Sequence, residues 1–287
     1  MEQLDTAIVG AGPAGISAAL NAKIRGLSFV LFGSPDHSGK VARSEQIQNY
    51  PGFPNVSGQQ LTQAFARQLE NMDIAVTKER VTSVYNMGNS FMLLADEQKE
   101  YTAKTVILAM GMNAAVQLPG EKDFLGRGVS YCATCDGNLY RGKTIAVVCD
   151  TPAMETEVEF LAGLAGKMYY LPLFQTSQFQ RPNVERLSAK IRKITGDSRV
   201  TGLELTDGSS LPVDGIFFLK QALPPMALLQ GLKMQDRHIA VDRQMRTNVS
   251  GCFAAGDCTG RPYQIAKAVG EGNTALHAVL EDLAGRG

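Results

Sequence analysis

The chain begins with two short apolar runs on either side of a longer stretch with the character of a helix. The runs at 7–9 and 27–32 predict buried strands, and residues 16–25 predict the helix between them. A strand, a helix and a second strand in this order form the βαβ unit of a parallel sheet. The start of the chain therefore predicts an α/β fold.

The same order of strand, turn and helix returns near the middle of the chain. Residues 145–148 predict a buried strand, and a tight turn leads from it into an amphipathic helix. The apolar positions of that helix are Met154, Val158, Leu161 and Ala162. A further short strand at 251–255 precedes a mostly helical segment, 263–279. We therefore predict an α/β protein with two Rossmann-like, three-layer (ββα) domains of the dinucleotide-binding type.

A glycine-rich loop joins the first predicted strand to its helix. Gly10, Gly12 and Gly15 follow the pattern G-x-G-x-x-G, in which the first glycine forms the turn, the second admits a pyrophosphate and the third lets the helix pack on the strand. Free N–H groups at the helix start can then bind the phosphates. Pro13 and Ala14 complete this candidate cofactor-binding loop. The alternative is a glycine-rich turn without a ligand.

Two places in the sequence concern the ribose of such a cofactor. An acidic residue usually ends the second strand of this motif and binds a ribose hydroxyl, but Phe32 and Gly33 stand there. Late in the chain, Gly256 and Asp257 form a turn between a short strand and a helix. Asp257 is therefore a candidate for binding a ribityl or ribose hydroxyl, and the alternative is a cap for the approaching helix.

The turn of the second strand–turn–helix unit has no glycine. It reads Cys149-Asp150-Thr151-Pro152, at the place where a nucleotide phosphate normally comes close to the backbone. Asp150 also adds a negative charge where a phosphate would lie. The middle of the chain therefore keeps the pattern of a nucleotide fold and lacks its phosphate-binding loop.

Composition and charge argue against several other classes of protein. The 28 basic and 28 acidic residues give zero net charge, whereas a nucleic-acid-binding protein usually has a basic excess. No apolar run reaches the roughly 18 residues of a membrane span, and the chain enters its first strand without a signal peptide. Five cysteines, an odd number in a long chain, argue against a secreted disulfide scaffold. We expect a soluble, cytoplasmic protein without nucleic-acid or membrane partners.

Two of the cysteines, Cys132 and Cys135, form a C-x-x-C at the start of a helical turn, and Asp136 follows directly. A helix N-terminus lowers the pKa of a thiol, and a neighbouring carboxyl can exchange protons during disulfide exchange. We therefore predict a redox-active pair. The alternatives are a structural C-x-x-C or half of a zinc site, which would need further ligands than the scattered histidines supply. The other cysteines are expected to be buried apolar residues: Cys149, Cys252 and Cys258.

The order of these motifs resembles the low-molecular-weight thioredoxin reductases along nearly the whole chain. The shared features are the glycine loop, the segment CATCDG at 132–137, a second strand–turn–helix and the segment GCFAAGD at 251–257. The resemblance implies FAD as the cofactor, thioredoxin as the substrate and a homodimer. It also implies that Cys135 is the flavin-proximal thiol, Cys132 is the interchange thiol and Asp136 is the acid/base.

Further positions match this family around the flavin. The turn Asn-Tyr-Pro-Gly that begins at Asn49 resembles the family's turn beside the flavin, and TVILAMG, ending at Gly111, resembles its strand leading out of the FAD domain. Lys40 stands where the family usually has a glutamine that faces the isoalloxazine. The cofactor-binding positions that the resemblance implies beyond the glycine loop are Lys40, Asn49, Gly111, Gly256, Asp257, Gln264, Ile265 and Ala266.

Three departures from the family concern the pyridine nucleotide. The family's second turn is G-x-G-x-x-A and binds NADPH, whereas cysteine, threonine and methionine occupy its small positions here. The arginines that pair with the 2′-phosphate in the family are missing from 172–176 and from Gln178. The exit strand of this domain, within 215–225, lacks the family's Ala-x-Gly. These losses predict a domain that keeps its fold and does not bind NADPH.

The resemblance therefore narrows to the ferredoxin-dependent flavin thioredoxin reductases. A plant-type ferredoxin lies at about −400 mV and thioredoxin at about −270 mV, so the transfer of two electrons is downhill by about 6 kcal/mol. Three alternatives stay open: a diflavin-linked disulfide oxidoreductase with a second FAD, an NADPH-dependent thioredoxin reductase with divergent contacts, and a non-catalytic redox sensor.

The FAD-binding domain is expected to be discontinuous, formed by residues 1–110 and 237–287. Residues 111–236 would form the degenerate NAD(P)-binding-like domain that carries the C-x-x-C.

Overall fold

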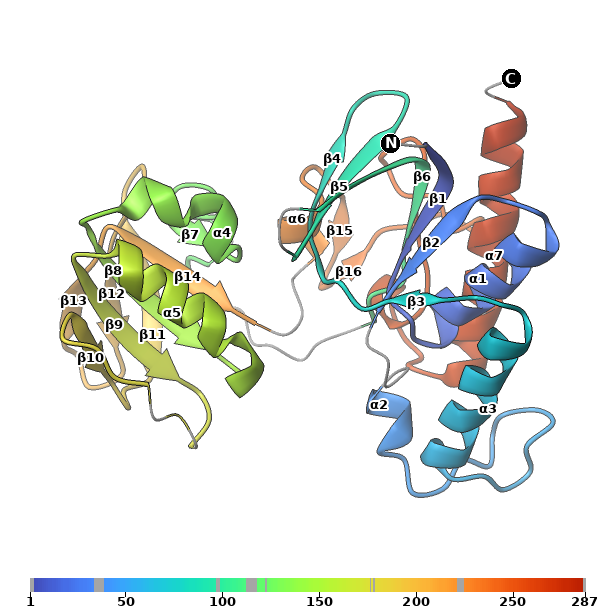
Figure 1. The fold of residues 1–287 in the computed structure, drawn as a ribbon, viewed down its shortest axis with the longest axis horizontal. Helices are drawn as coiled ribbons and strands as arrows, with labels where there is room; N and C mark the ends of the chain where they lie inside the picture. The colour runs from blue at the N-terminus through green and yellow to red at the C-terminus, as the bar shows by residue number, and fades with distance from the viewer. Residues whose placement is uncertain are drawn as a thin grey trace. The chain divides into compact units, whose positions relative to one another are not determined.

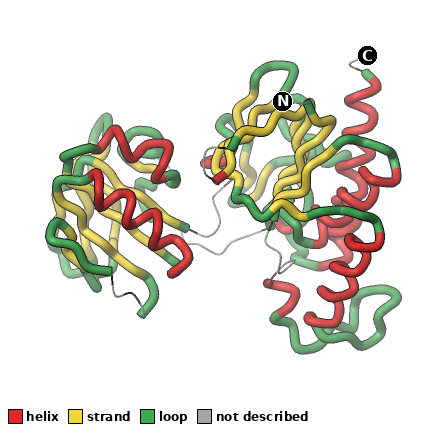
Figure 2. Tube along the Cα trace, viewed as in Figure 1, coloured by secondary structure: helices red, strands yellow, loops and turns green. Residues whose placement is uncertain are grey.

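The computed structural model describes residues 3–33, 39–96, 99–111, 118–121, 123–175, 177, 179–220 and 225–285. The chain divides into two compact units, the first formed by Met1–Asn113 with Pro224–Gly287 and the second by Ala114–Leu223. In each unit the strands form a layer with helices packed beside it (Figure 1, Figure 2), which confirms the predicted α/β class. None of the described helices is long and apolar enough to cross a membrane.

The first unit is built on one mixed sheet. In spatial order its strands are β3 (Val76–Thr77), β2 (Phe29–Phe32), β1 (Leu4–Val9), β6 (Glu100–Leu108), β5 (Phe91–Ala95) and β4 (Val81–Asn86), with β17 (Cys252–Ala254) also paired to β6. The pairs of β1, β2, β3, β6 and β17 are parallel, whereas β4 and β5 run antiparallel to their neighbours. Because these strands are parallel, the carboxyl ends of β1, β6 and β17 lie at the same edge of the sheet. Gly10, Gly111 and Gly256 follow these three ends.

The helices of the first unit are α1 (Pro13–Ile24), α2 (Gly39–Ala42), α3 (Gly58–Asn71), α6 (Pro225–Leu228) and α7 (Ile265–Ala284). Helices α1 and α7, blue and red in Figure 1, lie side by side. A Cβ atom on Gly272 would lie 2.0 Å from the backbone oxygen of Ala14. The Ser17 hydroxyl donates a 2.7 Å hydrogen bond to the Val269 carbonyl. This close approach holds α1, and the glycine loop before it, against α7.

Replacing Gly272 by alanine is expected to lower the free energy of unfolding by about 1–3 kcal/mol, because the new Cβ would overlap the Ala14 oxygen. Gly270→Ala is the matched control on the same helix. A Cβ there meets no atom within 4 Å, and alanine favours a helix over glycine by up to about 1 kcal/mol. The urea midpoints of the two variants should therefore move in opposite directions. Equal shifts would show that the α1–α7 contact tolerates a side chain.

The second unit is built on a parallel sheet. In spatial order its strands are β10 (Val184–Arg186), β9 (Lys167–Pro172), β8 (Thr144–Cys149), β14 (Gly215–Leu219) and β7 (Val129–Ser130). An antiparallel sheet accompanies it, formed by β11 (Ile191–Gly196), β12 (Val200–Leu205) and β13 (Ser210–Pro212). Helix α5 (Glu155–Leu164) buries Val158 and Leu161 in a core shared with Tyr170 and Phe217. This is the strand–turn–helix unit that the sequence predicts after residue 144.

The second crossing between the units lies at 223/224, earlier than the predicted boundary at 237. The segment after 224 belongs to the first unit, because α6 contacts β4 and Leu228 is buried. A two-stranded hairpin follows, formed by β15 (Met234–Gln235) and β16 (His238–Ile239). Elements this short have too little hydrophobic periodicity to mark a boundary in the sequence.

Candidate functional site

The glycine loop between β1 and α1 is packed too closely for side chains. Gly10 has a φ of +118°, and a Cβ on it would lie 2.3 Å from the backbone oxygen of Ala109. A Cβ on Gly15 would lie 1.7 Å from the backbone oxygen of Gly10. These contacts give the physical reason for the first and third glycines of the motif, which form the turn and let the helix approach the strand.

The N-terminus of α1 is open to an anion. Gly12 is the N-cap and supplies no side-chain hydrogen bond, and Pro13 occupies the first turn, which contains no acidic residue. The first N–H groups and the positive end of the helix dipole are therefore not neutralised by a side-chain cap or a first-turn carboxylate. This is the arrangement that a phosphate-binding helix start requires.

Candidate residues from distant parts of the chain meet in the first unit. The Lys40 ammonium lies 2.5 Å from Asp257 Oδ2, although 217 positions separate the two residues. The Asn49 side chain donates a 2.6 Å hydrogen bond to Gln264 Oε1 across 215 positions. The structure therefore brings four of the residues that the family resemblance implied into two directly contacting pairs.

The Lys40–Asp257 pair is partly open to solvent. The Lys40 side chain is 58% exposed and that of Asp257 is 16% exposed, so the pair adds little to stability. The ammonium also lies 5.1 Å from the centre of the Tyr263 ring, whose hydroxyl is 2.7 Å from His238 Nε2. Asp257 thus has a cationic neighbour within the candidate site.

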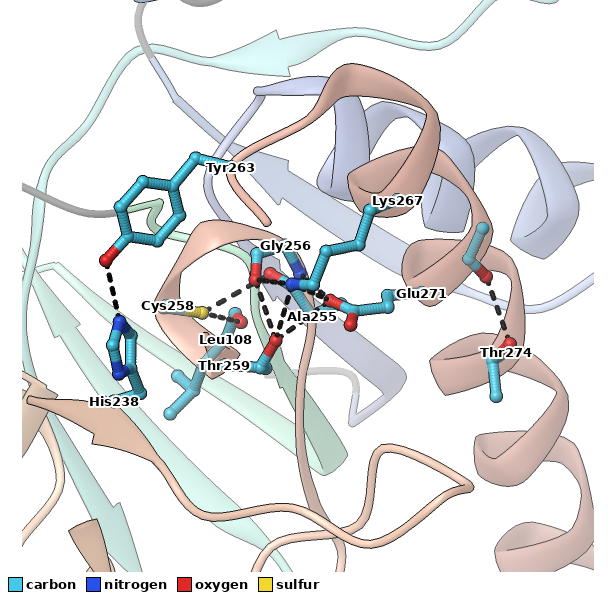
Figure 3. Close-up of polar contacts among 11 residues, drawn as sticks. Leu108, His238, Ala255, Gly256, Cys258, Thr259, Tyr263, Lys267, Glu271 and Thr274 are labelled. Atoms are coloured by element: carbon cyan, nitrogen blue, oxygen red, sulfur yellow. Dashed lines mark hydrogen bonds and ion pairs between the residues drawn. The ribbon is translucent and has the colours of Figure 1, made fainter. Parts of the chain in front are cut away.

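A network from α7 fixes the turn that carries Asp257 (Figure 3). Gly256 has a φ of +91°, and its N–H donates a 2.8 Å hydrogen bond to Glu271. The Lys267 ammonium donates to the Gly256 carbonyl at 3.0 Å and pairs with Glu271 at 3.0 Å. The Thr259 hydroxyl lies within hydrogen-bond distance of both the Gly256 carbonyl and the Glu271 carboxylate, and can donate to one of them at a time. The backbone of this turn is therefore held from both its N–H and its carbonyl side.

The remaining cofactor candidates lie at strand and helix ends of the same unit. Gly111 follows β6 with a φ of +69°. Ile265 and Ala266 open α7, whose N-cap Gln264 makes no side-chain cap and whose first turn contains no acidic residue. The first unit thus has a second helix N-terminus without a neutralising side chain.

In the second unit, Cys132 and Cys135 form a disulfide with their Cα atoms 5.3 Å apart. Cys132 is the N-cap of α4 (Ala133–Asp136), and its sulfur accepts a 3.2 Å hydrogen bond from the Cys135 N–H. The Thr134 hydroxyl lies 3.5 Å from the same sulfur. Both donors stabilise negative charge on Cys132 Sγ when the disulfide opens.

Asp136 is tied to this disulfide through a serine that the sequence did not single out. The hydroxyl of Ser130, the last residue of β7, donates a 2.6 Å hydrogen bond to Asp136 Oδ2. The Ser130 hydroxyl oxygen in turn accepts a 3.1 Å hydrogen bond from the Cys132 N–H. The predicted acid/base and the predicted interchange cysteine therefore share one partner.

The three other cysteines are buried, as the sequence predicts. Burial raises the pKa of Cys149 to about 11 and the pKa values of Cys252 and Cys258 to about 12. Thiols that stay protonated are poor nucleophiles and poor metal ligands. Across the described ranges, no three His, Cys, Asp or Glu side chains are placed to hold a metal ion.

The turn after β8 is closed by its own atoms. A short 3-10 turn, Pro152–Met154, joins the strand to α5, and the Cys149 thiol donates a 3.2 Å hydrogen bond to the Thr151 carbonyl. The Leu173 N–H, at the end of the neighbouring strand, donates to the Cys149 carbonyl at 2.8 Å. At the first position where the family pattern has a glycine, the Cys149 side chain therefore has a hydrogen-bond partner of its own.

The N-terminus of α5 carries carboxylates. Glu155, the first residue of the helix, accepts hydrogen bonds from Tyr170 Oη at 3.1 Å and Ser177 Oγ at 2.5 Å. Glu157 also lies in the first turn. Their negative charges neutralise the positive end of the helix dipole and repel a phosphate. The first turn of α5 thus carries two carboxylates, whereas the first turn of α1 carries none.

Part of the predicted loss of phosphate-binding cations lies outside the described residues, at Thr176 and Gln178, and so does part of the altered exit-strand segment, at 221–224. One cation that no sequence motif indicated, Arg186, does bind within the segment 172–178. The Arg186 guanidinium donates a 2.6 Å hydrogen bond to the Ser177 carbonyl. Arg186 is therefore bound to the backbone of Ser177, the residue whose hydroxyl donates to Glu155.

A model of the pyridine nucleotide-disulphide oxidoreductases matches residues 4–148 and 176–272. This chain belongs to that family. The match omits 149–175, the segment that contains the altered turn, α5 and β9. The carboxylates of Glu155 and Glu157 at the start of α5 lie within this omitted segment.

Within the pyridine nucleotide-disulphide oxidoreductases, the chain is a thioredoxin reductase-type enzyme. A ferredoxin-flavin thioredoxin reductase from Clostridium acetobutylicum has a similar structure, with a TM-score of 0.89 and 44% identity over 99% of both chains. A second structure of that description gives a TM-score of 0.84 at 42% identity over 99% of both chains. The thioredoxin reductase of Helicobacter pylori is 32% identical over 98% of this chain and 99% of its own.

The family implies a flavin cofactor, and the first unit fits a flavin dinucleotide. Its loop has glycines where a Cβ would overlap backbone, and the helix start beyond that loop carries no carboxylate. The second unit does not fit a dinucleotide by the same criteria, because side chains and carboxylates occupy its turn.

Several residues at these sites were not predicted. Lys267 and Glu271 stand four positions apart on α7, a spacing that indicates a helical ion pair but not its bond to the Gly256 turn. Tyr263 directly precedes the predicted Gln264, and Ser130 precedes Cys132 by two positions. Neither carries a motif, so only the folded chain shows what they contact.

Proposed function

We propose that this enzyme reduces thioredoxin through FAD and the Cys132–Cys135 pair, with electrons from ferredoxin rather than NADPH. The observation that carries the proposal is the contrast between the two helix starts, one open to phosphate after β1 and one bearing carboxylates after β8. The similarity to a ferredoxin-flavin thioredoxin reductase supports the choice of donor. The proposal includes a homodimer and a cytoplasmic location, as expected from the sequence.

FAD would be held by the first unit. The residues proposed to bind it are Gly10, Gly12, Pro13, Ala14, Gly15, Lys40, Asn49, Gly111, Gly256, Asp257, Gln264, Ile265 and Ala266. A bound flavin supplies the ability to take electrons singly and pass them on in pairs, which links a one-electron donor to a two-electron disulfide.

The protein's own residues would carry out the disulfide exchange. Two electrons and two protons convert the Cys132–Cys135 disulfide into two thiols. Cys132 passes its proton to Asp136, and the thiolate attacks a sulfur of the thioredoxin disulfide. The mixed disulfide forms, and the thioredoxin thiolate that leaves takes the proton from Asp136.

Cys135 completes the exchange in the same way. Its proton passes to Asp136, and its thiolate attacks the Cys132 sulfur of the mixed disulfide. The protein disulfide re-forms, and the second thioredoxin thiolate leaves with that proton. The exchange as a whole consumes no electrons or protons beyond those that opened the disulfide.

Anaerobic absorbance spectra of the flavin test the proposed donor. Reduced ferredoxin is expected to bleach the oxidised flavin within seconds, whereas equal amounts of NADPH or NADH should leave the spectrum unchanged, because the N-terminus of α5 repels phosphate. Rapid bleaching by NADPH would favour the alternative enzyme with divergent nucleotide contacts. Flavin that neither ferredoxin nor a nicotinamide reduces would favour the redox sensor.

A further inference from the structure

We propose that Ser130 is a positioning residue, which keeps the Asp136 carboxyl hydrogen-bonded in both its ionised and its protonated state during disulfide exchange. The inference rests on the proposed function, because it takes Asp136 to be the acid/base of that exchange. An acid/base must gain and lose a proton in every cycle, so it needs a partner that suits both states.

The Ser130 hydroxyl has three contacts, all to the redox segment. Its oxygen lies 2.6 Å from Asp136 Oδ2 and 3.2 Å from the Cys132 carbonyl, both of which are acceptors. It also accepts the 3.1 Å hydrogen bond from the Cys132 N–H. A hydroxyl has one hydrogen and two lone pairs, so it can donate to only one of these two acceptors at a time.

The three contacts satisfy Asp136 in both protonation states. When the carboxyl is ionised, Ser130 donates to Asp136 Oδ2 and accepts from the Cys132 N–H. When the carboxyl is protonated, it donates its own hydrogen to Ser130 Oγ, and the serine hydrogen turns to the Cys132 carbonyl. The change requires rotation of one O–H bond and no movement of heavy atoms. Proton transfer at Asp136 therefore leaves the backbone of Cys132 in place.

The surrounding structure holds Ser130 in this geometry. The residue is 4% exposed, and its strand β7 pairs with β14 through Phe217. The next residue, Tyr131, donates its hydroxyl hydrogen bond to the buried carboxylate of Glu121. Burial raises the pKa of Tyr131, so its hydroxyl keeps the hydrogen that this bond needs.

Glu121 is in turn fixed by the end of β14. Its carboxylate pairs with the Lys220 ammonium at 2.5 Å, with side-chain exposures of 0% and 8%, and accepts a 2.8 Å hydrogen bond from the Leu118 N–H. Removing one partner of a buried pair leaves an uncompensated charge, so the pair resists opening. The chain on either side of Ser130 is therefore anchored, and the hydroxyl stays aimed at Asp136.

The test compares two acceptors of electrons from the same enzyme. Holoenzyme is reduced with excess dithiothreitol, desalted under argon and mixed with oxidised thioredoxin or with an activated aromatic disulfide, dithiobis-nitrobenzoate. Transfer to thioredoxin uses Asp136 twice, to take the Cys132 proton and to protonate the leaving thiolate, whereas the aromatic thiolate is a good leaving group without a proton and needs only the first step. Ser130→Ala is expected to slow transfer to thioredoxin by about tenfold or more and transfer to the aromatic disulfide by no more than about a third of that factor.

Two further variants complete the comparison. Ser130→Thr retains the hydroxyl and should keep transfer to thioredoxin within about threefold of the parent rate. Ser209→Ala is the matched control, because Ser209 also donates a 2.6 Å hydrogen bond to an aspartate, Asp207, in an exposed turn between β12 and β13. It should match the parent with both acceptors.

Equal slowing of both transfers in Ser130→Ala would show that the serine only supports the local structure, and unchanged transfer to thioredoxin would show that Asp136 does not need it. Either result overturns the proposal. Chemical reduction makes the test independent of ferredoxin, so an error in the proposed donor does not affect it. A parent enzyme that passes no electrons to thioredoxin would instead overturn the proposed function, and the role of Ser130 with it.

Discussion

Replacing Cys132 or Cys135 by serine is expected to abolish thioredoxin reduction, with a loss of at least about a thousandfold in turnover. The proposed exchange needs both sulfurs, since in it one attacks the substrate disulfide and the other resolves the mixed disulfide. The remaining cysteines cannot substitute, because they are buried and burial raises their pKa values. Turnover of thioredoxin with reduced ferredoxin measures the loss, and Cys149→Ala should stay within about threefold of the parent.

The two serine variants should differ in their spectra. If Cys135 is the flavin-proximal thiol, Cys132→Ser leaves a thiolate beside the oxidised flavin, which should produce a long-wavelength charge-transfer band. Cys135→Ser should show no such band and should leave Cys132 open to alkylation by iodoacetamide. The opposite pattern would exchange the roles of the two cysteines. Substantial thioredoxin reduction by either variant would contradict the proposed exchange.

Gly15→Ala is expected to remove most of the flavin from the enzyme. The new Cβ would lie 1.7 Å from the Gly10 oxygen, so the loop and the start of α1 must move apart. Displacement of a phosphate-binding helix start weakens its hydrogen bonds to the ligand. The parent should release about one FAD per chain on heat denaturation, and we expect the variant to release less than about a tenth of that amount.

Gly270→Ala serves as the control for this measurement as well, since its Cβ meets no atom within 4 Å and it should retain the full flavin content. A parent that releases two flavins per chain would favour the diflavin alternative. Full flavin content in Gly15→Ala would show that the loop after β1 does not carry the cofactor.

The glycine loop could be predicted from the sequence because backbone geometry selects its residues. Gly10 requires a φ of +118°, and Gly15 lies where any side chain would overlap the turn. Such constraints act within a few residues of the chain, so they leave a local pattern. The C-x-x-C and the strand–turn–helix units were predictable for the same reason.

Contacts between distant segments could not be predicted in this way. Asn49 meets Gln264 across 215 positions, and Glu121 meets Lys220 across 99, and no periodicity relates the members of either pair. The family resemblance implied that Asn49 and Gln264 belong to one site. It did not show the hydrogen bond between them, or the one from Ser130 to Asp136.

The altered second turn was predictable only in part. The sequence shows that its glycines are missing, which predicts the loss of a phosphate site. It does not show that Glu155 accepts hydrogen bonds from Tyr170 and Ser177, because these residues come from a strand and a loop later in the chain. The structure therefore gives a second reason to expect no phosphate here, because the first turn of α5 already carries carboxylates.

The rate of thioredoxin reduction with each electron donor tests the central claim most directly. Purified holoenzyme and oxidised thioredoxin are incubated without oxygen, with either photoreduced ferredoxin or NADPH, and the new thioredoxin thiols are counted. We predict turnover with ferredoxin that is at least about a hundredfold faster than with NADPH, which corresponds to about 2.7 kcal/mol of difference between the two donors. Equal or faster turnover with NADPH would contradict the claim that the second unit keeps the dinucleotide-binding fold but does not bind NADPH.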